Sequence, residues 1–483
     1  MGRAVIIGSG LGGLECGLIL ARNGWDVTVL EQGARIGGCL QSFRRGEAEF
    51  DTGFHHVGGL GEGENLRWLF EWLGLMDLPW KRMDDDCVDE VIIGSRTYRL
   101  PCGDKRLEEY LTSLFPAEAE GIKRYISTVR AISDGVRDIL LPDHDISAAG
   151  ISAYEFLRGT LRDEKLIQVM SSMTSRMQYD ASMTPLYEYA QITGAFMQSG
   201  WRLKGTGQQI ADRLAGNLAG LGGKVLTGCR AVSIRESGGR AEAVVCSDGR
   251  VFEGDVIISD AHPSVTMRLA EGCPSLKNIS RKRIDSLKDS NGALTVNIRL
   301  KPGTVPYVNH SIFIHPEDSD TWHGKGSRRS VLVSFGVPGK GDSASTMDLL
   351  TEVRADEFAE WESTSPGRRD DGYLKRKTEI AEECISIASE RLHGLRDAID
   401  GIFVSTPLTY RDYTSTRNGS AFGTMKDFNS PITTFLSPKT SIRGLYMTGQ
   451  NLNLHGILGV SLTALYTCAE ILGAEEIRKQ AGL

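Results

Sequence analysis

Residues 3–13 read Arg-Ala-Val-Ile-Ile-Gly-Ser-Gly-Leu-Gly-Gly, and this stretch decides the fold. Residues 3–7 have the apolar run of a buried parallel strand. The glycines that follow have the spacing G-x-G-x-x-G, at Gly8, Gly10 and Gly13, and residues 14–22 predict a helix. Strand, glycine turn and helix in this order are typical of a dinucleotide-binding unit, whereas the glycine spacing alone would be weak support.

Each part of this unit has a physical role. Gly8 permits the tight turn, Gly10 lets the backbone approach a pyrophosphate, and Gly13 lets helix and strand pack closely. The helix begins beside Leu11 and Gly12, and its free N–H groups attract phosphate. A second predicted strand, residues 26–30, ends at Glu31, 18 residues beyond Gly13. A carboxylate there accepts hydrogen bonds from ribose hydroxyls and repels a 2′-phosphate, which disfavours NADP.

Three further stretches belong with this unit. Gln32 leads into Arg35-Ile36-Gly37-Gly38-Cys39, and Phe50-Asp51-Thr52-Gly53-Phe54-His55-His56 follows. In mid-chain, residues 210–221 predict a helix, and residues 224–226, 229–234 and 255–259 predict strands, the last leading into Asp260-Ala261-His262-Pro263. Near the far end, a strand runs into Thr448-Gly449-Gln450, and His455-Gly456-Ile457-Leu458-Gly459-Val460 opens a helix.

Together these stretches resemble the paired-glycine flavoprotein superfamily, which includes amine oxidases, phytoene desaturases, carotenoid isomerases and retinol saturases. The retinol saturase and carotenoid isomerase branch is most similar, through Gly37-Gly38-Cys39 and Thr448-Gly449-Gln450. The resemblance implies FAD as the cofactor. It departs at Gln450, where many members carry Asp or Glu, although glutamine can still hydrogen-bond ribityl hydroxyls.

The same resemblance implies which residues contact FAD. Gly37 and Gly38 would pass close to the pyrophosphate and ribityl groups, and the backbone of Val232 would contact adenine. The turn at Asp260 would lie near FAD, and Gly449 and Gln450 near the ribityl phosphate. The helix opened by Gly456, Ile457, Leu458, Gly459 and Val460 would aim its N-terminus at the flavin pyrimidine, where reduced flavin carries negative charge.

The fold class that follows is α/β: a discontinuous, Rossmann-type FAD-binding domain with an inserted α+β substrate domain and a helical cap. We expect the FAD-binding domain over residues 1–80, 200–270 and 400–483, and the substrate domain over 81–199 and 271–399. Residues 104–200 look mostly helical. Strands are expected at 293–300, 309–315 and 329–336, and helices at 347–363 and 373–393.

The proposed chemistry needs few protein groups, because flavin accepts or delivers the hydride itself. His55, His56 and His455 are candidate catalytic residues that would move a proton, although a loop histidine is more often held by backbone groups. Cys39 is expected to be a buried structural thiol. The cap methionines, Met170, Met173, Met177, Met183 and Met197, could line a substrate tunnel, but core filling is the favoured interpretation.

Composition excludes several classes of protein. The net charge of −7 requires no basic face, so we expect no nucleic-acid partner. The nine cysteines are scattered and contain no C-x-x-C, which indicates neither a disulfide framework nor a metal site and favours a reducing, cytoplasmic location. No apolar run reaches the ~18 residues that a spanning helix needs. The glycines at 220–223 precede a strand and mark a helix end, so they do not form a second dinucleotide motif that could bind NAD. Electrons would therefore pass to or from an unidentified external donor or acceptor.

The leading hypothesis is an FAD-dependent oxidoreductase acting on C–C or C=C bonds of an apolar isoprenoid or retinoid-like lipid, by saturation, desaturation or isomerisation. Such a substrate implies peripheral membrane contact. An amine oxidase-like enzyme is the alternative. A non-catalytic prenyl- or lipid-binding escort protein is a third hypothesis, which the intact Gly8, Gly10, Gly13 and Glu31 disfavour.

Overall fold

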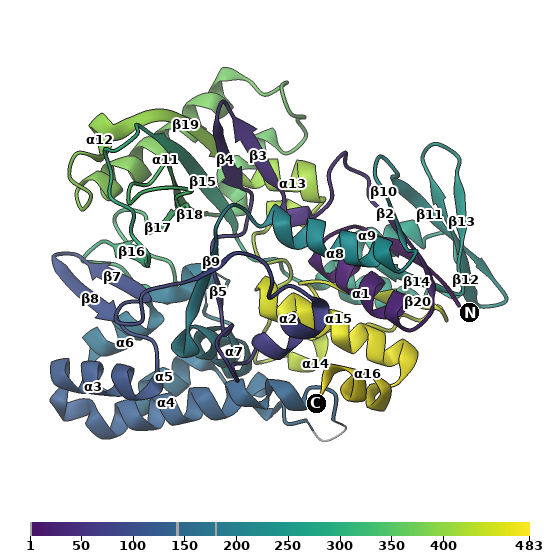
Figure 1. The fold of residues 1–483 in the computed structure, drawn as a ribbon, viewed down its shortest axis with the longest axis horizontal. Coiled ribbons are helices and arrows are strands. Elements are labelled where there is room, and N and C mark those ends of the chain that lie inside the picture. Colours follow the sequence, from purple (N-terminus) through teal and green to yellow (C-terminus); the bar gives the residue numbers. More distant parts are fainter. Residues whose placement is uncertain (1, 142–143, 179–180) are drawn as a thin grey trace.

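Five parallel strands build the sheet that carries the glycine turn (Figure 1). A computed structural model describes residues 2–141, 144–178 and 181–483. The strand order is β10 (Lys224–Leu226), β2 (Asp26–Leu30), β1 (Arg3–Ile7), β14 (Val256–Ser259) and β20 (Leu445–Met447). The strands expected near 3–7, 26–30, 224–226, 255–259 and before Thr448 are therefore confirmed.

Both faces of this sheet are covered, which explains the continuous apolar sequence of β1. Ala4 and Ile6 pack on one side, where helices α1 (Leu11–Arg22), α8 (Gln208–Gly220) and α15 (Gly456–Leu472) lie. Val5 and Ile7 face the opposite side. There they meet the antiparallel sheet of β11 (Ala231–Ser237), β12 (Arg240–Cys246) and β13 (Val251–Glu253), and α9 (Pro263–Leu269).

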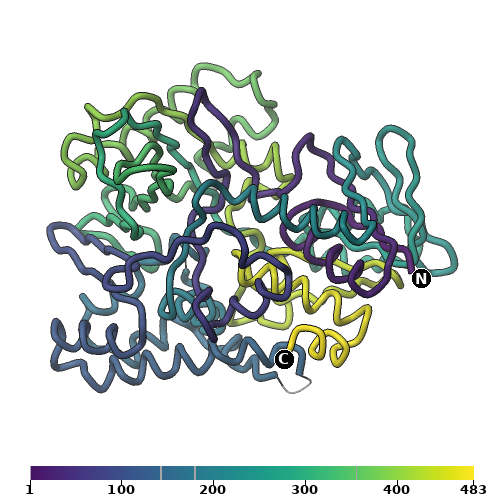
Figure 2. Tube along the Cα trace, in the orientation of Figure 1, coloured from purple at the N-terminus to yellow at the C-terminus, as the bar shows by residue number. Residues whose placement is uncertain are grey.

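Distant parts of the chain meet in this layer. Ala4 of β1 pairs with Val256 of β14, and Ile257 of β14 pairs with Leu445 of β20. Figure 2 shows the purple start, the teal middle and the yellow end of the tube together on the same side of the molecule. The unit that carries the glycine turn is thus discontinuous in sequence.

A seven-stranded sheet forms the second layer. Its order is β19 (Ile399–Ser405), β15 (Gly292–Leu300), β18 (Thr346–Val353), β17 (Val331–Phe335), β16 (Ser311–His315), β7 (Asp89–Ile93) and β8 (Arg96–Leu100). Neighbouring strands are antiparallel except β7 and β16, which are parallel. Helix α11 (Asp371–Ser389) covers one face, and the cap helices cover the other.

The cap helices are α3 (Asp104–Leu114), α4 (Ala119–Asp134), α5 (Ala153–Thr160), α6 (Glu164–Ser171) and α7 (Leu186–Gln198). This agrees with the helical character expected of residues 104–200. Four of the cap methionines, Met170, Met173, Met177 and Met197, belong to the core that these helices share with Phe313 and Leu332. Core filling is therefore confirmed for these four, and the half-buried Met183 lies outside that core.

The prediction of a helix over residues 347–363 is wrong. Residues 346–353 form β18, and a 3-10 helix, η6 (Ala355–Trp361), follows. Met347, Leu349, Thr351 and Val353 are buried while the residues between them are half-buried, so the apolar period is two and not 3.6. The other expected elements of this layer agree with β15, β16, β17 and α11.

Shorter elements join the layers. They are β3 (Ser42–Arg45), β4 (Ala48–Asp51), β5 (Val57–Gly58), β6 (Trp80–Arg82), β9 (Gly200–Leu203), α2 (Arg67–Leu73), α10 (Asn278–Ser286), α12 (Leu395–Ala398), α13 (Pro407–Thr414), α14 (Pro431–Thr434) and α16 (Ala474–Ala481). The remaining 3-10 turns are η1 (Gly38–Leu40), η2 (Pro116–Glu118), η3 (Gly135–Asp138), η4 (Ser147–Gly150), η5 (Ser172–Arg176) and η7 (Arg417–Gly419).

The residue ranges expected for the two domains include residues 1, 142–143 and 179–180, which lie outside the described residues. The limit at residue 400 falls inside β19, which pairs with β15 in the seven-stranded sheet. We propose the limit after Ser405, because that keeps this sheet within one unit. All nine cysteines are free thiols. Among the described residues, no helix is long and apolar enough to cross a membrane.

Candidate functional site

A cavity of about 430 Å³ lies where the five-stranded sheet meets the seven-stranded sheet and the cap. Most of the residues singled out from the sequence line it. They are Gly8, Gly10, Leu11, Gly12, Glu31, Gln32, Gly37, Gly38, Cys39, His55, His56, Asp260, Gly449, Gln450, His455, Gly456, Ile457, Leu458, Gly459 and Val460. The fold thus brings segments from both ends and the middle of the chain to one site.

The turn after β1 can form only with glycines. Gly8 has φ +98°, a left-handed conformation that other residues avoid. A Cβ on Gly10 would overlap Oδ2 of Asp260, and a Cβ on Gly13 would overlap the carbonyl oxygen of Gly8. Gly13 does not line the cavity, which fits its expected role in helix–strand packing.

The N-terminus of α1 is open to the cavity. Its N-cap residue is Gly10, which has no side chain to accept the first N–H groups, and no acidic residue lies in the first turn. Uncapped N–H groups and the helix dipole make this end an anion site. The residues present therefore fit a pyrophosphate.

Glu31 is fixed at the end of β2 by three donors. Its Oε2 accepts from the Ser9 backbone N–H at 3.1 Å and from the Ser9 hydroxyl at 2.5 Å. Its Oε1 accepts from the Gly33 N–H at 2.7 Å. Each carboxylate oxygen has two acceptor positions, so Oε2 is fully used and Oε1 keeps one position for a ribose hydroxyl. Ser9 was not expected as a site residue, although it lies inside the glycine motif.

The paired glycines lie against the first turn. Gly37 has φ +115° and donates its N–H to the Ser9 carbonyl at 2.9 Å. A Cβ on Gly38 would lie 3.2 Å from Cα of Gly10, so both turns need bare backbone at this approach. Cys39 is exposed, because its side chain lines the cavity. The prediction that Cys39 is a buried structural thiol is therefore wrong.

Asp260 lies among the glycines of both chain ends. A Cβ on Gly12 would lie 2.9 Å from its Oδ1, and one on Gly449 would overlap the same atom. Burial, with a smaller contribution from Glu31, raises the pKa of Asp260 to about 7, against the opposing N–H groups of Gly13 and Gly10. A carboxyl group that titrates near neutrality thus lies beside the proposed phosphate position.

The second chain end completes the site. Gly449 has φ +93°, and a Cβ on Gly12 would lie 3.2 Å from its backbone nitrogen. Helix α15 begins at Gly456 without a side-chain cap and without an acidic residue in its first turn. A second positive helix end therefore faces the cavity, in the position that a negatively charged ring would use.

Val232 is not among the residues that line the cavity. Its side chain is 46% exposed, because a bulge between Ala231 and Ser233 interrupts the pairing of β11 with β12 there. Ala231 and Cys229 line the cavity instead. The contact expected between adenine and the Val232 backbone stays a prediction.

His55 has a free ring nitrogen. Its Nδ1 lies 3.5 Å from Oδ2 of Asp348, and its buried Nε2 has no hydrogen-bond partner among the described residues. Asp348 itself is held by Asn297, whose Nδ2 donates to Oδ1 at 2.6 Å. A carboxylate at Nδ1 favours the tautomer with the proton on Nδ1, which leaves Nε2 as an acceptor.

His56 is held from both sides. Its Nε2 accepts from Nε of Arg176 at 3.0 Å, and its Nδ1 lies 3.4 Å from the Ser311 hydroxyl. Burial, then the charges of Arg176 and Arg202, lowers the pKa of His56 well below its usual value. His56 is therefore neutral, and its one lone pair is engaged.

Arg176 forms a buried ion pair that sequence analysis missed. Its Nη1 donates to Oδ2 of Asp89 at 2.7 Å, and its Nη2 donates to Oδ1. The guanidinium also lies 3.9 Å from the centroid of Phe196 and 4.9 Å from that of Phe313. Arg176 is 9% exposed and Asp89 2%. Neither residue lies in a motif, so no sequence signal indicated the pair.

His455 precedes α15 and is nearly buried. Its Nε2 lies 3.3 Å from Oε1 of Glu188, close enough for an ion pair but without hydrogen-bond geometry. Its ring lies 4.6 Å from that of Phe422. Glu188 is held in turn by Nε2 of Gln178 at 2.6 Å. Glu188 was also missed from the sequence.

Several buried polar atoms around the cavity make no hydrogen bond to the described residues. They are His55 Nε2, His455 Nε2, Ser175 Oγ, Gln191 Oε1 and Ser420 Oγ. Buried polar atoms are normally hydrogen-bonded, so such a group indicates a polar ligand that supplies the missing bonds. The cavity also has an apolar lining, here called the apolar wall, which is made by Phe54, Ile192, Phe196, Leu332, Leu350 and Leu454.

Comparisons with known proteins identify the family and similar folds. The family model described as flavin containing amine oxidoreductase matches residues 11–392. The all-trans-retinol 13,14-reductase of Danio rerio is 24% identical over 532 residues, covering 97% of this chain and 85% of that protein. The chloroplastic prolycopene isomerase 1 of an Oncidium hybrid is 22% identical, covering 99% and 85%. An oxidoreductase structure from Methanosarcina mazei has a TM-score of 0.66 at 16% identity, covering 96% and 99%.

Proposed function

Because the chain belongs to the flavin-containing amine oxidoreductase family, we propose that it acts on C–C or C=C bonds of an apolar isoprenoid or retinoid-like polyene. It is an FAD-dependent oxidoreductase. The named activities of the relatives, retinol reduction and prolycopene isomerisation, support a polyene substrate. The observation that carries the proposal is one cavity that is lined by both a dinucleotide cradle and the apolar wall.

The cradle residues would hold FAD by contacts that their chemistry favours. Glu31 would accept from a ribose hydroxyl, the α1 N-terminus would bind the pyrophosphate, and the α15 N-terminus would face the flavin pyrimidine. When bound, FAD supplies a hydride acceptor or donor at its N5 position. The protein must then position the polyene, exclude water and move a proton.

His55 is the best candidate for the proton transfer. Its Nε2 has no hydrogen-bond partner among the residues that the structure describes, and Asp348 lies at Nδ1, so Nε2 can take up a proton and pass it on. His56 is a positioning residue, because its lone pair is engaged by Arg176. His455 would orient α15 and the ring of Phe422.

The apolar wall would select the substrate. Ile192 and Phe196 come from α7, and Leu332 and Leu350 come from the seven-stranded sheet. A polyene offers no hydrogen bonds, so its binding depends on apolar area, worth roughly 25 cal/mol per Å² removed from water. A charged substrate group would be desolvated against this wall at a cost.

The amine oxidase-like alternative is less well supported. It calls for a lysine near the flavin, and no lysine lines the cavity among the described residues. The buried Lys426 instead donates to the carbonyls of Asn451 at 2.8 Å, Thr434 at 3.0 Å and Leu452 at 3.1 Å. These three bonds use all three of its protons. The escort-protein hypothesis is disfavoured by the intact cradle around Gly10 and Glu31.

Anaerobic stopped-flow tests the proposal. The photoreduced holoenzyme is mixed with all-trans-retinol or a cis-carotene, the oxidised holoenzyme is mixed with putrescine, and the flavin absorbance is followed in each case. We expect a polyene to reoxidise the flavin, or to isomerise while the flavin stays reduced, and putrescine to leave oxidised enzyme unbleached. Rapid bleaching by amines with no response to any polyene would overturn the assignment.

A pair of variants separates substrate binding from folding. Ile192 lines the cavity, whereas Ile132 is equally half-buried on α4 and does not line it. We expect Ile192→Asn to weaken polyene binding at least about tenfold, by loss of about 1.5–3 kcal/mol of apolar burial. Ile132→Asn should keep wild-type polyene affinity, and both should keep the flavin spectrum. Equal losses in both variants would place the substrate elsewhere.

The electron donor or acceptor would come from outside the chain. Residues 220–223 end α8 and precede β10, so they form a helix end and not a second nucleotide motif. A quinone, oxygen or a redox protein would therefore exchange electrons with the flavin. Turnover with a water-soluble quinone as acceptor or with its quinol as donor, but not with NADH or NADPH, is the expected result. Direct reduction of the flavin by either nucleotide would refute it.

Peripheral membrane contact is also part of the proposal. Ile279 on α10 is 71% exposed and Ile432 on α14 is 89% exposed. Nη2 of Arg283 donates to the Ile432 carbonyl at 2.6 Å and joins the two helices. Exposed lysines lie nearby in sequence at Lys277, Lys282 and Lys288. Apolar tips beside basic groups suit an anionic lipid surface.

Liposome flotation tests this surface. With phosphatidylserine-containing vesicles we expect wild type to float, and Ile432→Asp to remain in the bottom fraction. Leu374→Asp is the matched control, because Leu374 is 51% exposed on α11, away from these helices. Wild-type protein that stays wholly in the bottom fraction would remove membrane contact from the proposal without affecting the assigned chemistry.

A further inference from the structure

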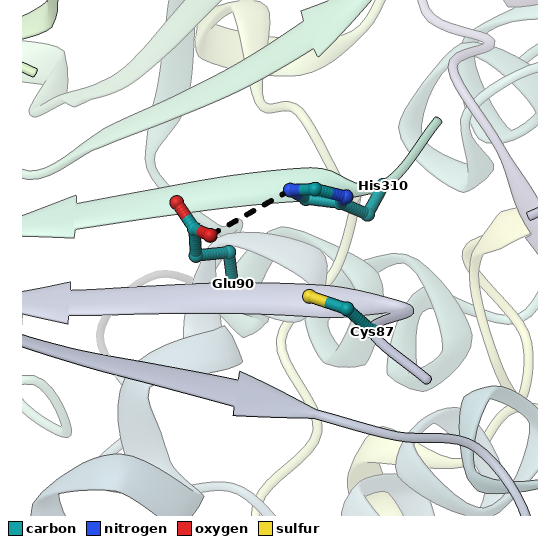
Figure 3. Close-up of side chains that lie close together, drawn as sticks. All are labelled: Cys87, Glu90 and His310. Atoms are coloured by element: carbon teal, nitrogen blue, oxygen red, sulfur yellow. Dashed lines mark ion pairs between the residues drawn. The ribbon is translucent and has the colours of Figure 1, made fainter. Parts of the chain in front are cut away.

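A cysteine, a glutamate and a histidine meet where strands β7 and β16 of the seven-stranded sheet begin (Figure 3). The Cys87 sulfur, a Glu90 carboxylate oxygen and a His310 ring nitrogen all lie within 4.8 Å of one another. Cys87 and His310 are buried, and Nε2 of His310 is 3.8 Å from Oε2 of Glu90. None of the three lines the FAD cavity.

Strand pairing brings these residues together. Glu90 is the second residue of β7, and His310 directly precedes β16, which runs parallel to β7. The N–H of Ser311 donates to the carbonyl of Val88 at 3.2 Å and sets the start of the pairing. No spacing in the sequence indicates the cluster, because its members come from strands more than 200 residues apart. For this reason the sequence predicted no metal site.

A carboxylate orients the histidine. Nδ1 of His310 lies 3.4 Å from Oδ2 of Asp84, and Oδ1 of Asp84 accepts from Nδ2 of Asn309 at 2.9 Å. Metal-binding histidines usually donate their second ring nitrogen to a carboxylate in this way. The arrangement leaves Nε2 of His310 facing Glu90 as a free acceptor.

We propose that Cys87, Glu90 and His310 bind a divalent transition-metal ion, with Zn²⁺ preferred. Sulfur and imidazole ligands suit Zn²⁺, whereas Mg²⁺ and Ca²⁺ require oxygen ligands. Three protein ligands would leave the fourth tetrahedral position to water. Bonds of about 2.0–2.3 Å place tetrahedral ligands roughly 3.3–3.8 Å apart, so the side chains close by about 1 Å on binding.

One cation competes for the site. Nη1 of Arg99 donates to Oε2 of Glu90 at 2.9 Å, but the Arg99 side chain is 54% exposed. It can therefore swing into solvent when Glu90 binds the metal. This competition makes Arg99 an informative position, because its removal would strengthen metal binding.

The bound ion would stabilise the support of the flavin site. Asp89 and Ser311, the immediate neighbours of Glu90 and His310, contact Arg176 and His56 respectively. Successive residues of a strand point to opposite faces. An ion that ties β7 to β16 would therefore also fix the strand register that holds His56 in place.

Calorimetric titration tests the site. The holoenzyme is stripped with EDTA, and ZnCl₂ is added. We expect one Zn²⁺ per chain, and at least about 100-fold weaker binding in Cys87→Ser and His310→Gln. Cys102→Ser is the matched control, because this nearby buried thiol contacts Asp85 and lies outside the cluster. It should bind Zn²⁺ as wild type does. The flavin spectrum of each variant reports whether it folds.

A second variant keeps the test decisive if the buried substitutions misfold. Arg99→Gln changes an exposed side chain, and we expect it to tighten Zn²⁺ binding severalfold by removing the competing cation. Elemental analysis of the untreated protein supplies the stoichiometry. Absence of stoichiometric Zn²⁺ binding, or affinity that is unchanged in Cys87→Ser and in Arg99→Gln, would overturn the proposal. Neither result bears on the proposed polyene activity.

Discussion

The Arg176–Asp89 pair should stabilise the protein by an amount that a double-variant cycle can measure. In Arg176→Met the Asp89 carboxylate keeps its burial and loses both of its hydrogen bonds from Arg176. An uncompensated buried charge costs about 3–5 kcal/mol. Adding Asp89→Asn replaces that charge by an unsatisfied neutral group, which costs about 1–3 kcal/mol. The double variant should therefore be about 2 kcal/mol more stable than Arg176→Met alone.

These free energies convert to modest shifts in Tm. Unfolding entropy is about 2.1 cal/mol/K per residue, or roughly 1 kcal/mol/K for a chain of this length that unfolds as one unit. Each kcal/mol then corresponds to about 1 °C. We expect Arg176→Met to lower the Tm by about 3–5 °C, and Asp89→Asn to recover about 2 °C of that loss.

Release of flavin fluorescence on heating measures these shifts. Arg158→Met is the control, because its partner Glu164 is 69% exposed and a surface pair contributes only about 0–1 kcal/mol. The Tm of Arg176→Met should therefore be well below the Tm of Arg158→Met. The reasoning is refuted if both arginine variants lose the same Tm, or if Asp89→Asn destabilises the Arg176→Met background further.

Three further outcomes follow from the site. Glu31→Gln should weaken FAD binding about tenfold or more, because the replacement loses the charge that accepts from Ser9 and Gly33; unchanged fluorescence quenching on reconstitution would contradict this. His55→Gln should lower turnover about 10²–10⁴-fold with full flavin content, and a lost flavin signal instead would make His55 structural. FAD affinity should fall as pH rises through about 7, because ionised Asp260 repels the pyrophosphate. Asp260→Asn should remove that pH dependence, and a dependence that persists would implicate another group.

The sequence predicts the dinucleotide unit well because its requirements are local. The turn at Gly8 and Gly10 permits few residues other than glycine, and the buried strands around it leave uninterrupted apolar runs. The closing helix after His455 was found for the same reason. The strands at residues 293–300 and 329–336 carry similarly clear patterns.

The remaining features depend on contacts that no local pattern encodes. The sequence of β18 predicts a helix, because Leu350 adds an apolar residue between the buried positions and hides the period of two. The bulge that turns Val232 outward depends on pairing with β12. Arg176, Asp89 and Glu188 are ordinary charged residues in sequence, and only the assembled fold buries them.

The order of strands in the parallel sheet has a consequence for biosynthesis. β1 leaves the ribosome first, but its neighbour β14 follows some 250 residues later, and β20 borders β14 only after residue 447 has been made. Until then the apolar face of α1 that α15 covers stays bare. The nascent chain therefore keeps that face exposed until its last strand and α15 have been made, and exposed apolar surface of this kind is prone to aggregation. Products of premature termination would hold no flavin and would present a ready target for proteolysis.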